Sequence, residues 1–206
     1  MIKSQKLSAA RAVRMPTLAE AMLDSLMMSS AVTSAVTRAA LVIFGSLLLA
    51  LSAQFKIPLY PVPVTGQTLV VLLIGMTYGP RLGGVTMAAY LFEGALGLPV
   101  FAGGAAGATV LMGPTGGYLF GFLFAGVTMG YLAKRGMGRT VVSTIAAIVI
   151  GNFVMYLCGA LWLANFVWFS QALVTGVLPF LYGDALKLFV AAGLMPVAWR
   201  AVTSVK

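Results

Sequence analysis

Six long apolar segments, joined by short polar or glycine-rich connections, dominate the pattern of this 206-residue chain. Their approximate bounds are Ala39–Phe55, Thr65–Gly79, Leu82–Leu96, Gly117–Ala133, Val141–Phe166 and Thr175–Trp199. The segments are continuously apolar rather than alternating, which argues against strands, and most approach the roughly 20 residues that a helix needs to cross a bilayer. The second and third are shorter, which indicates tilted helices or ends below the membrane surface. The pattern predicts an all-α membrane protein with six transmembrane helices.

The composition supports this class. The chain is 61% hydrophobic and 8% charged, with a mean hydropathy of +1.02, whereas soluble domains carry about 25% charged residues. There is no histidine and one cysteine, Cys158, which excludes a disulfide within the chain and argues against a transition-metal site. We expect Cys158 to be a packing residue and expect no cofactor. The net charge of +9 does not indicate nucleic-acid binding, because the basic residues flank apolar segments instead of forming a soluble face.

The basic residues predict the orientation in the membrane. With the N-terminus placed inside, most of the 13 lysines and arginines fall on the inner side: Lys3, Lys6, Arg11, Arg14, Arg38, Arg81, Lys134, Arg135, Arg139, Arg200 and Lys206. Lys56 falls in an outer connection, and Lys187 lies within the sixth segment. Cytoplasmic connections are enriched in Lys and Arg. The distribution therefore predicts an even number of spans in the cell membrane, with both termini cytoplasmic.

The two long outer connections avoid charge. The first, Lys56–Gln67, contains three prolines that prevent regular helix, and the second, Leu98–Gly117, is rich in glycine and holds no charged residue. Irregular, uncharged backbone at a membrane suits a segment that lines a cavity. We expect these loops to cover a binding site.

Residues 1–34 differ from the rest of the chain. They are basic and rich in Met and Ala, and they lack the compact apolar core and small-residue cleavage site of a signal peptide. We predict a cytoplasmic extension, as a tail or an amphipathic helix on the membrane surface. The predicted organisation is this extension, 1–34, followed by one transmembrane domain, 35–206.

Asp184 and Lys187 lie inside the sixth apolar segment. A charge near the bilayer centre costs about 3 kcal/mol on insertion scales, so it needs a function or a partner. The spacing of three residues puts both side chains on one helical face. The pair indicates a polar binding site in the outer half of the membrane, and the alternative is an ion pair that only holds helices together.

Two further polar residues lie within the apolar segments. Glu93 is close to the outer end of the third segment, where a carboxylate can also reach water, and Asn152 lies near the middle of the fifth. The default role of such an asparagine is an interhelical hydrogen bond. A proton relay through Glu93 and Asp184 is a rival interpretation, because acids within membrane segments also serve pumps and carriers.

Small residues repeat at four-residue spacing on several segments. The repeats are Gly117-x-x-x-Gly121 and Gly126-x-x-x-Gly130 on the fourth segment, Ser46-x-x-x-Ala50 on the first, and Ala31, Ala35 and Ala39 before it. Such faces allow close approach of helices. We expect packing within the chain, with docking of a partner membrane protein as the alternative.

The sequence offers no sign of catalysis. It contains no H-E-x-x-H or G-x-S-x-G motif and no nucleophile beside a plausible base. Gly103 and Gly104 lack the Lys-Ser/Thr that follows a phosphate-binding loop. We predict that the protein is not an enzyme, and an intramembrane enzyme acting on a lipid-like substrate is the weakest alternative.

The loops carry a family resemblance. The matching pieces are PVPVTGQT (61–68), GPRLG (79–83), GLPVFAGG (97–104) and GPTGGY (113–118), with the Asp-x-x-Lys of the last segment. The stretch from Ile57 to Tyr118 resembles the BioY family, the biotin-specific S components of energy-coupling factor (ECF) vitamin transporters. The resemblance implies six transmembrane helices, binding of biotin on the outward side and its release inside.

The resemblance also implies partners and site residues. In the family, a transmembrane T component and two cytoplasmic ATPases supply the energy, although some members occur without dedicated partners. A small-x-x-x-small pattern on the first helix contacts the T component there, and here the alanine series precedes the apolar core of that helix. Asp184 and Lys187 are implied to form the site, with Thr65, Gln67, Gly103 and Gly104 near it.

The chemistry of biotin suits this assignment. Its ureido ring offers two N–H donors and a carbonyl, which match a carboxylate and an ammonium group, and charge-assisted hydrogen bonds in a dry pocket are strong. Tyr90, Phe92 and Tyr118 are candidates to cover the apolar ring. The rival interpretations are an S component for another vitamin and a stand-alone proton-coupled carrier.

Overall fold

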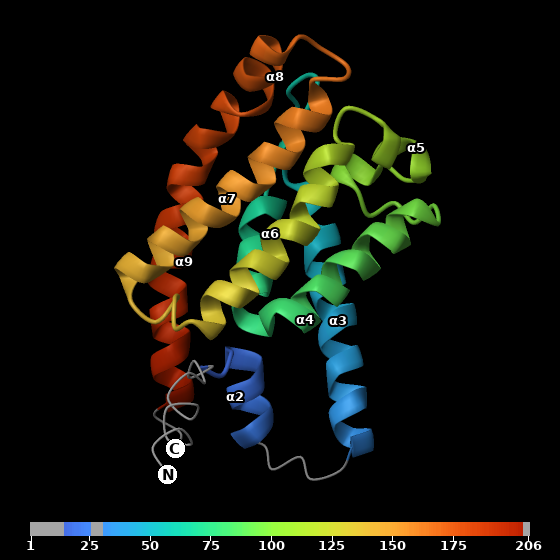
Figure 1. The fold of residues 1–206 in the computed structure, drawn as a ribbon. Coiled ribbons are helices and arrows are strands. Elements are labelled where there is room, and N and C mark those ends of the chain that lie inside the picture. The colour runs from blue at the N-terminus through green and yellow to red at the C-terminus, as the bar shows by residue number, and fades with distance from the viewer. Residues whose placement is uncertain (1–14, 26–30, 204–206) are drawn as a thin grey trace, which may run out of the picture.

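The computed structural model describes residues 15–25 and 31–203, and helices make up most of them (Figure 1). The helices are α2 (Leu18–Ser25), α3 (Ala31–Gln54), α4 (Gln67–Ala95), α5 (Ala108–Met112), α6 (Gly116–Lys134), α7 (Val141–Leu163), α8 (Phe169–Gly176) and α9 (Leu178–Thr203), with a 3₁₀ turn η1 (Ala102–Gly104). Two short strands, β1 (Lys56–Ile57) and β2 (Val64–Thr65), pair antiparallel in the first outer connection. Five of the basic residues that were predicted to lie on the inner side fall outside the described residues: Lys3, Lys6, Arg11, Arg14 and Lys206.

The described helices form a bundle with distinct ends. In Figure 1, α5, α8 and the connections beside them lie at the upper end, and α2 and the last turns of α9 lie at the lower end. Four helical stretches are long and apolar enough to cross a membrane: Thr33–Gln54, Gln67–Ala95, Gly116–Lys134 and Val141–Leu163. The run Phe169–Arg200, bent by 49°, adds a fifth when taken as one span. The prediction of a helical, multi-pass membrane protein is confirmed at this level.

The second and third predicted segments belong to a single helix, α4, that is broken in the middle. Gly79 has φ 81° and ψ 177°, which a residue with a side chain rarely adopts, and Pro80 follows it. Proline is tolerated in the first turn of a helix because its missing N–H would have no partner there. The GPRLG stretch therefore makes a corner within α4 instead of a loop between two helices, as the change of direction in Figure 1 shows.

Glycines hold α6 against its two neighbours. A Cβ at Gly75 would lie 2.5 Å from the carbonyl oxygen of Gly126, and one at Gly130 would overlap the backbone of Gly79 and Pro80. On the other side, a Cβ at Gly121 would lie 3.0 Å from the carbonyl oxygen of Met155 on α7. Close approach of this kind is the usual role of small-residue repeats in membranes. The prediction that the α6 repeats pack within the chain is confirmed.

The α3 repeats behave differently. Ser46 is buried and donates a hydrogen bond to the carboxylate of Glu93, whereas Ala35 and Ala39 are exposed on the bundle surface. In the most apolar 18-residue part of this helix, only 17% of the residues are buried. Most of α3 is therefore available to lipid or to another protein.

The short helix α2 is fixed to the lower end of the bundle. Thr17 and Glu20 form a reciprocal pair, in which the N–H of Thr17 donates to Glu20 (3.0 Å) and the N–H of Glu20 donates to the Thr17 hydroxyl (3.4 Å). This capping box satisfies amides that the helix start leaves free. Lys134 Nζ donates to Glu20 at 2.8 Å, and Leu18 packs in a cluster with Trp199. The predicted boundary at residue 35 falls four residues inside α3, which begins at Ala31.

The Glu20–Lys134 pair predicts a pH dependence. Burial raises the pKa of the Glu20 carboxyl, but the hydrogen bonds and charge of Lys134 and the amide of Thr17 outweigh burial and hold that pKa below its ordinary value of 4.5. The pair therefore stabilises the fold above about pH 4.5, and this stabilisation is lost as the pH falls through the lowered pKa. We expect Glu20→Gln to lower the unfolding temperature by a few degrees at neutral pH, because partly exposed pairs contribute about 0–1 kcal/mol.

The measurement is the difference in unfolding temperature between the wild-type protein and Glu20→Gln over a pH series. The expected difference shrinks to zero at acidic pH. A difference that stays constant from neutral to acidic pH contradicts the ionic origin of the contact.

Candidate functional site

Asp184 is buried in the bundle and surrounded by hydrogen-bond donors. Its side chain lies on α9, and the residue is 7% exposed. One carboxylate oxygen accepts hydrogen bonds from Asn152 Nδ2 (2.9 Å) and from the Tyr156 hydroxyl, both on α7. The other oxygen faces Lys187 Nζ at 3.5 Å. The predicted pair is therefore real, and donors from a second helix hold its carboxylate in place.

Lys187 connects α9 to the first outer connection. Its Nζ donates to the carbonyl oxygen of Thr65 (3.0 Å), which ends β2, and to the hydroxyl of Thr68 (2.6 Å), in the first turn of α4. A buried ammonium group needs its donors satisfied, and these two oxygens with Asp184 supply three acceptors. The pair is therefore part of a network that joins four elements, α4, α7, α9 and β2.

The helical run that carries the pair bends at this point. The stretches Phe169–Ala185 and Lys187–Arg200 meet at an angle of 49°, so Asp184 and Lys187 lie on either side of the bend. Interrupted membrane helices commonly mark binding sites, because charged groups and irregular backbone are tolerated where they line a cavity.

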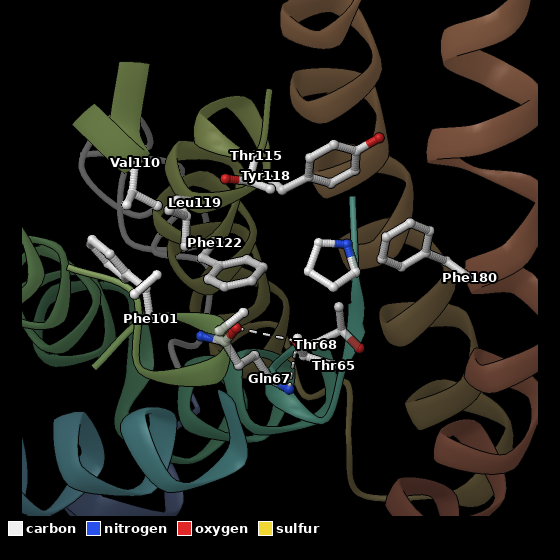
Figure 2. Close-up of a pocket in the computed structure, with 13 residues that line it drawn as sticks. Thr65, Gln67, Thr68, Phe101, Val110, Thr115, Tyr118, Leu119, Phe122 and Phe180 are labelled. Carbon is white, nitrogen blue, oxygen red and sulfur yellow. Dashed lines mark hydrogen bonds between the residues drawn. The ribbon is translucent and has the colours of Figure 1, made fainter. Parts of the chain in front are cut away.

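A cavity of about 140 Å³ opens beside this network. Figure 2 shows its polar floor, formed by Thr65, Gln67 and Thr68, and its aromatic and aliphatic walls. The full lining is Pro63, Thr65, Gln67, Thr68, Phe101, Ala102, Ala105, Val110, Thr115, Tyr118, Leu119, Phe122 and Phe180. Residues of both predicted loops line it, so the expectation that these loops lie over a cavity agrees with the geometry.

The aromatic walls are held by contacts of their own. Tyr118 on α6 stacks on Phe180 of α9, with ring centroids 5.6 Å apart and 11° between the planes. Its hydroxyl donates to the carbonyl oxygen of Gly176 at 2.7 Å. Phe101, from the second loop, is 1% exposed and meets Tyr90 edge to face. Rigid rings around a small cavity suit a flat, partly apolar ligand.

A chain of hydrogen bonds supports the floor. The hydroxyl of Thr65 donates to Gln67 Oε1 (3.1 Å), Gln67 Nε2 donates to the Tyr90 hydroxyl (2.6 Å), and that hydroxyl donates to the carbonyl oxygen of Val100 (2.9 Å). Tyr90 is fully buried behind the cavity. It therefore orients Gln67 and anchors the second loop, and its predicted contact with a ligand stays a prediction.

Gly103 and Gly104 lie in η1, at the rim of the cavity. Both are exposed and have positive φ angles, 69° and 78°. The side chain of Lys56 lies across Gly103, since a Cβ there would collide with its Nζ. The neighbouring Ala102 and Ala105, rather than the glycines, line the cavity. The glycines thus shape the second loop and let it approach the first.

Three other predicted residues have different positions. Asn152 lies on α7 and donates a hydrogen bond to Asp184, and among the described residues its Oδ1 has no hydrogen-bond partner. Glu93 faces Ser46 on α3, not the Asp184–Lys187 pair. Phe92 is 64% exposed and is not part of the cavity lining, so its predicted contact with a ligand stays a prediction. Which neighbours these three side chains have depends on how the helices pack against one another, not on the depth of each residue in the membrane.

A larger hollow of about 530 Å³ lies between α7, α8 and α9. Asn152, Tyr156 and Asp184 line it, but its other residues are apolar. Three of these are more than half exposed: Phe153 (65%), Leu161 (56%) and Phe169 (54%). Such a face is what a membrane helix presents to lipid. The smaller cavity, with its polar floor and loop cover, is the better candidate for a polar ligand.

Sequence reasoning missed several residues that the structure places at the site. They are Thr68, Phe101, Phe122, Tyr156 and Phe180. Two of them carried a usable signal: Tyr156 follows Asn152 by one helical turn, and Thr68 belongs to the TGQT stretch. The phenylalanines did not, because nothing local distinguishes them from the many apolar residues around them.

The arrangement can bind but offers little chemistry. Amide and hydroxyl groups and aromatic rings line the cavity, and the Asp184–Lys187 pair contacts its floor through Thr65 and Thr68. Among residues 15–25 and 31–203, no group of three or more His, Cys, Asp and Glu side chains could hold a metal ion. The fold and site define a multi-pass membrane protein that binds a small, partly polar molecule near one end of its bundle.

Comparison with known proteins identifies the family. The model of the BioY family matches residues 22–204. A probable biotin transporter BioY of Pyrococcus horikoshii is 41% identical over 140 residues, which cover 68% of this chain and 82% of that protein. The biotin transporter BioY of Thermotoga maritima is 40% identical over 146 residues, with 70% and 85% covered. The chain belongs to the BioY family.

A solved structure has the same fold. The crystal structure of the S-component for biotin from an ECF-type ABC transporter superposes with a TM-score of 0.74 and 24% sequence identity. The match covers 82% of this chain and 93% of that one. The family is one of transporter components, so the prediction that the protein is not an enzyme is confirmed.

Proposed function

We propose that this protein is the S component of a biotin uptake system, which binds biotin on the outward side of the cell membrane and delivers it inward. The observation that carries the proposal is the Asp184–Lys187 pair, of which Asp184 is buried and Lys187 partly buried. The pair contacts the floor of a loop-covered cavity, in a chain of the BioY family. Two charged side chains within a membrane segment cost free energy. Binding of a ligand that interacts with both charges gives a functional reason for keeping them.

In this proposal, Asp184 and Lys187 bind the polar groups of biotin. Lys187 already reaches Thr65 and Thr68 on the cavity floor, so a ligand there replaces or joins these acceptors. Gln67 supplies a further amide group, while Tyr90 and Asn152 hold Gln67 and Asp184 in position. Such preorganised donors bind tightly because little reorganisation accompanies binding.

The apolar part of biotin fits the remaining walls. We propose that Tyr118, stacked on Phe180, covers the thiophane ring, and that Gly103 and Gly104 let the second loop close over the site. Glu93 is proposed to act on the site indirectly, by holding the second loop. The amide of Leu98, at the start of that loop, donates to the backbone carbonyl oxygen of Glu93 at 3.1 Å.

The proposed topology counts six transmembrane helices, with the two parts of α4 on either side of Gly79 taken separately. Both termini are then cytoplasmic. Three basic residues lie at or near helix ends on the same side of the bundle as α2: Arg81, Lys134 and Arg200. This distribution supports the proposed orientation, because basic residues are enriched on the cytoplasmic side. Lys56 lies in the outer connection, beside the second loop.

The proposed partners are a transmembrane T component and a pair of cytoplasmic ATPases. The chain itself carries no Walker-type phosphate loop that would hydrolyse ATP. The exposed α3, with its small residues Ala35 and Ala39 on the surface, is the proposed contact face for the T component.

Thr68 provides a graded test of the site. We expect Thr68→Val to weaken biotin binding roughly threefold to tenfold, because Lys187 loses an acceptor whose hydrogen bond contributes about 0.5–1.5 kcal/mol. The matched control is Thr86→Val, since the buried Thr86 hydroxyl donates to the carbonyl oxygen of Leu82 in its own helix and has no other hydrogen bond among the described residues. Equal losses in both variants contradict a specific role of Thr68.

The substrate and the mode of transport are tested separately. Detergent-purified protein is expected to retain biotin with nanomolar affinity and to leave other vitamins unbound. Binding of another vitamin in place of biotin contradicts the substrate assignment. In proteoliposomes, uptake driven by a proton gradient alone, without an ATPase, supports the carrier alternative and contradicts the S-component assignment.

A further inference from the structure

A polar cavity of about 260 Å³ is lined by residues of α2, α3, α4 and α6. Helix α2 lies at the end of the bundle opposite α5 and α8 (Figure 1). Its lining consists of Ala19, Glu20, Arg38, Tyr78, Pro80, Arg81, Leu82, Val85 and Lys134. The biotin site uses none of these residues. The cavity therefore needs its own explanation.

Cations dominate the lining. Arg38, Arg81 and Lys134 come from three different helices, and the only acidic residue in the lining is Glu20. Glu20 is already bound to Lys134 at 2.8 Å. Arg38 and Arg81 are exposed, and neither takes part in the two ion pairs found among the side chains that the structure describes. The lining as the structure describes it thus holds three cations and one carboxylate, which leaves an excess of positive charge in the cavity.

The cavity is built on rigid structure. Arg81 follows the Gly79–Pro80 corner, and Gly130 of α6 packs directly against the backbone of that corner. The amide of Met15 donates to the carbonyl oxygen of Lys134 at 3.0 Å, which fixes the start of the α2 segment against α6. A preformed cationic site loses little entropy when an anion binds.

One wall of the cavity is apolar and continues onto the lipid-facing surface. Leu82 and Val85 follow Arg81 on α4, and Val85 is 55% exposed. On the neighbouring α3, Ile43 is 59% exposed. A ligand that fits this surface carries an anionic group beside an apolar chain, and the anionic group lies at the level of the membrane surface, where the helices end.

We propose that this cavity binds the phosphate group of an anionic phospholipid, with Arg38 and Arg81 as the contacting residues and Lys134 adding positive charge. Guanidinium groups match phosphate oxygens through paired hydrogen bonds. Basic pockets between membrane helices at the headgroup level suit such lipids. The acyl chains then lie along Leu82 and Val85, on the α4 side of the cavity. A free phosphate shares the headgroup chemistry but has no use for the apolar wall.

The test uses native mass spectrometry of the full chain in detergent. Short-chain phosphatidylglycerol, phosphatidylcholine, inorganic phosphate and a peptide of Glu and Asp are added separately. We expect phosphatidylglycerol to bind about tenfold more tightly than phosphatidylcholine, and the double variant Arg38→Gln/Arg81→Gln to lose this preference. The control is Arg135→Gln, an exposed arginine near the same end that does not line the cavity, and it should keep the preference.

Each alternative has its own outcome. Equal binding of the two lipids, or an unchanged preference in the double variant, contradicts the site. Displacement of phosphatidylglycerol by an equal concentration of inorganic phosphate assigns the cavity to a soluble anion, and preferential binding of the acidic peptide assigns it to a protein partner; both overturn the lipid proposal. Biotin binding at the opposite end of the bundle reports whether a variant is folded. The single variants Arg38→Gln and Arg81→Gln should each bind biotin normally and lose part of the preference for phosphatidylglycerol. This result separates the loss of lipid contacts from unfolding.

Discussion

Replacing Lys187 by Met is expected to abolish biotin binding while the protein stays folded in the membrane. Methionine keeps the length and most of the volume of the side chain, so packing around α9 changes little. The substitution removes the donor to Thr65 and Thr68 and leaves the buried carboxylate of Asp184 without its cation. Truncating one partner of a buried charged pair at a binding site costs about 2–5 kcal/mol, which is a loss of about 30-fold to several thousandfold in affinity.

The measurement is equilibrium binding of labelled biotin to detergent-purified protein, together with the yield of membrane-inserted protein. Arg135→Met is the control for loss of a positive charge, because Arg135 is exposed just after α6, away from the site. Asn152 and Tyr156 still hold Asp184 in the Lys187→Met variant, which is why we expect folding to survive. If the variant is no longer found in the membrane, the pair serves the fold; if it binds biotin normally, the pair is not the site.

A methyl group added at Gly130 is expected to destabilise the whole bundle. The Cβ of Gly130→Ala would overlap the backbone of Gly79 and Pro80, and backbone cannot move aside as a flexible side chain can. Either α6 separates from α4 or the corner of α4 shifts. Overpacking of a well-packed contact typically costs about 1–3 kcal/mol, and a backbone clash lies at the upper end of this range.

The matched control is Gly193→Ala, on α9. Gly193 is exposed, and a Cβ there would meet no atom within 4 Å. The same chemical change should therefore leave the unfolding temperature in detergent unchanged or slightly higher, while Gly130→Ala lowers it by several degrees. Similar unfolding temperatures for the two variants contradict the close contact between α4 and α6. Because the corner also carries Arg81, Gly130→Ala should disturb the cationic cavity as well.

The sequence predicted the class of the fold and the charged pair, for local reasons. The length and apolarity of a helix that enters lipid are properties of a continuous stretch, and the spacing of Asp184 and Lys187 places them on one face of any helix. The family resemblance rests on the loop motifs, and those loops do line the cavity with Thr65 and Gln67.

What the sequence could not show depends on how the helices pack. In the sequence, Glu93 and Asp184 are both carboxylates within apolar segments. In the structure, Glu93 lies on a helix face that points to Ser46, whereas Asp184 lies on one that points to Tyr156. Phe180 is one of twelve phenylalanines, and only its contact with Tyr118 marks it as a wall of the site. The break of α4 at Gly79 was visible as a GPRLG stretch, but its nature as a corner within a helix follows from the contact with α6.

The central claim is that biotin binds in the loop-covered cavity beside Lys187, and a structure of the protein with bound biotin tests it most directly. We predict density for one biotin between Tyr118, Phe122 and Phe180, with a polar atom of the ligand within hydrogen-bond distance of Lys187 or Asp184. Density in the apolar hollow between α7 and α9 instead, or no bound biotin at saturating concentration, would contradict the account.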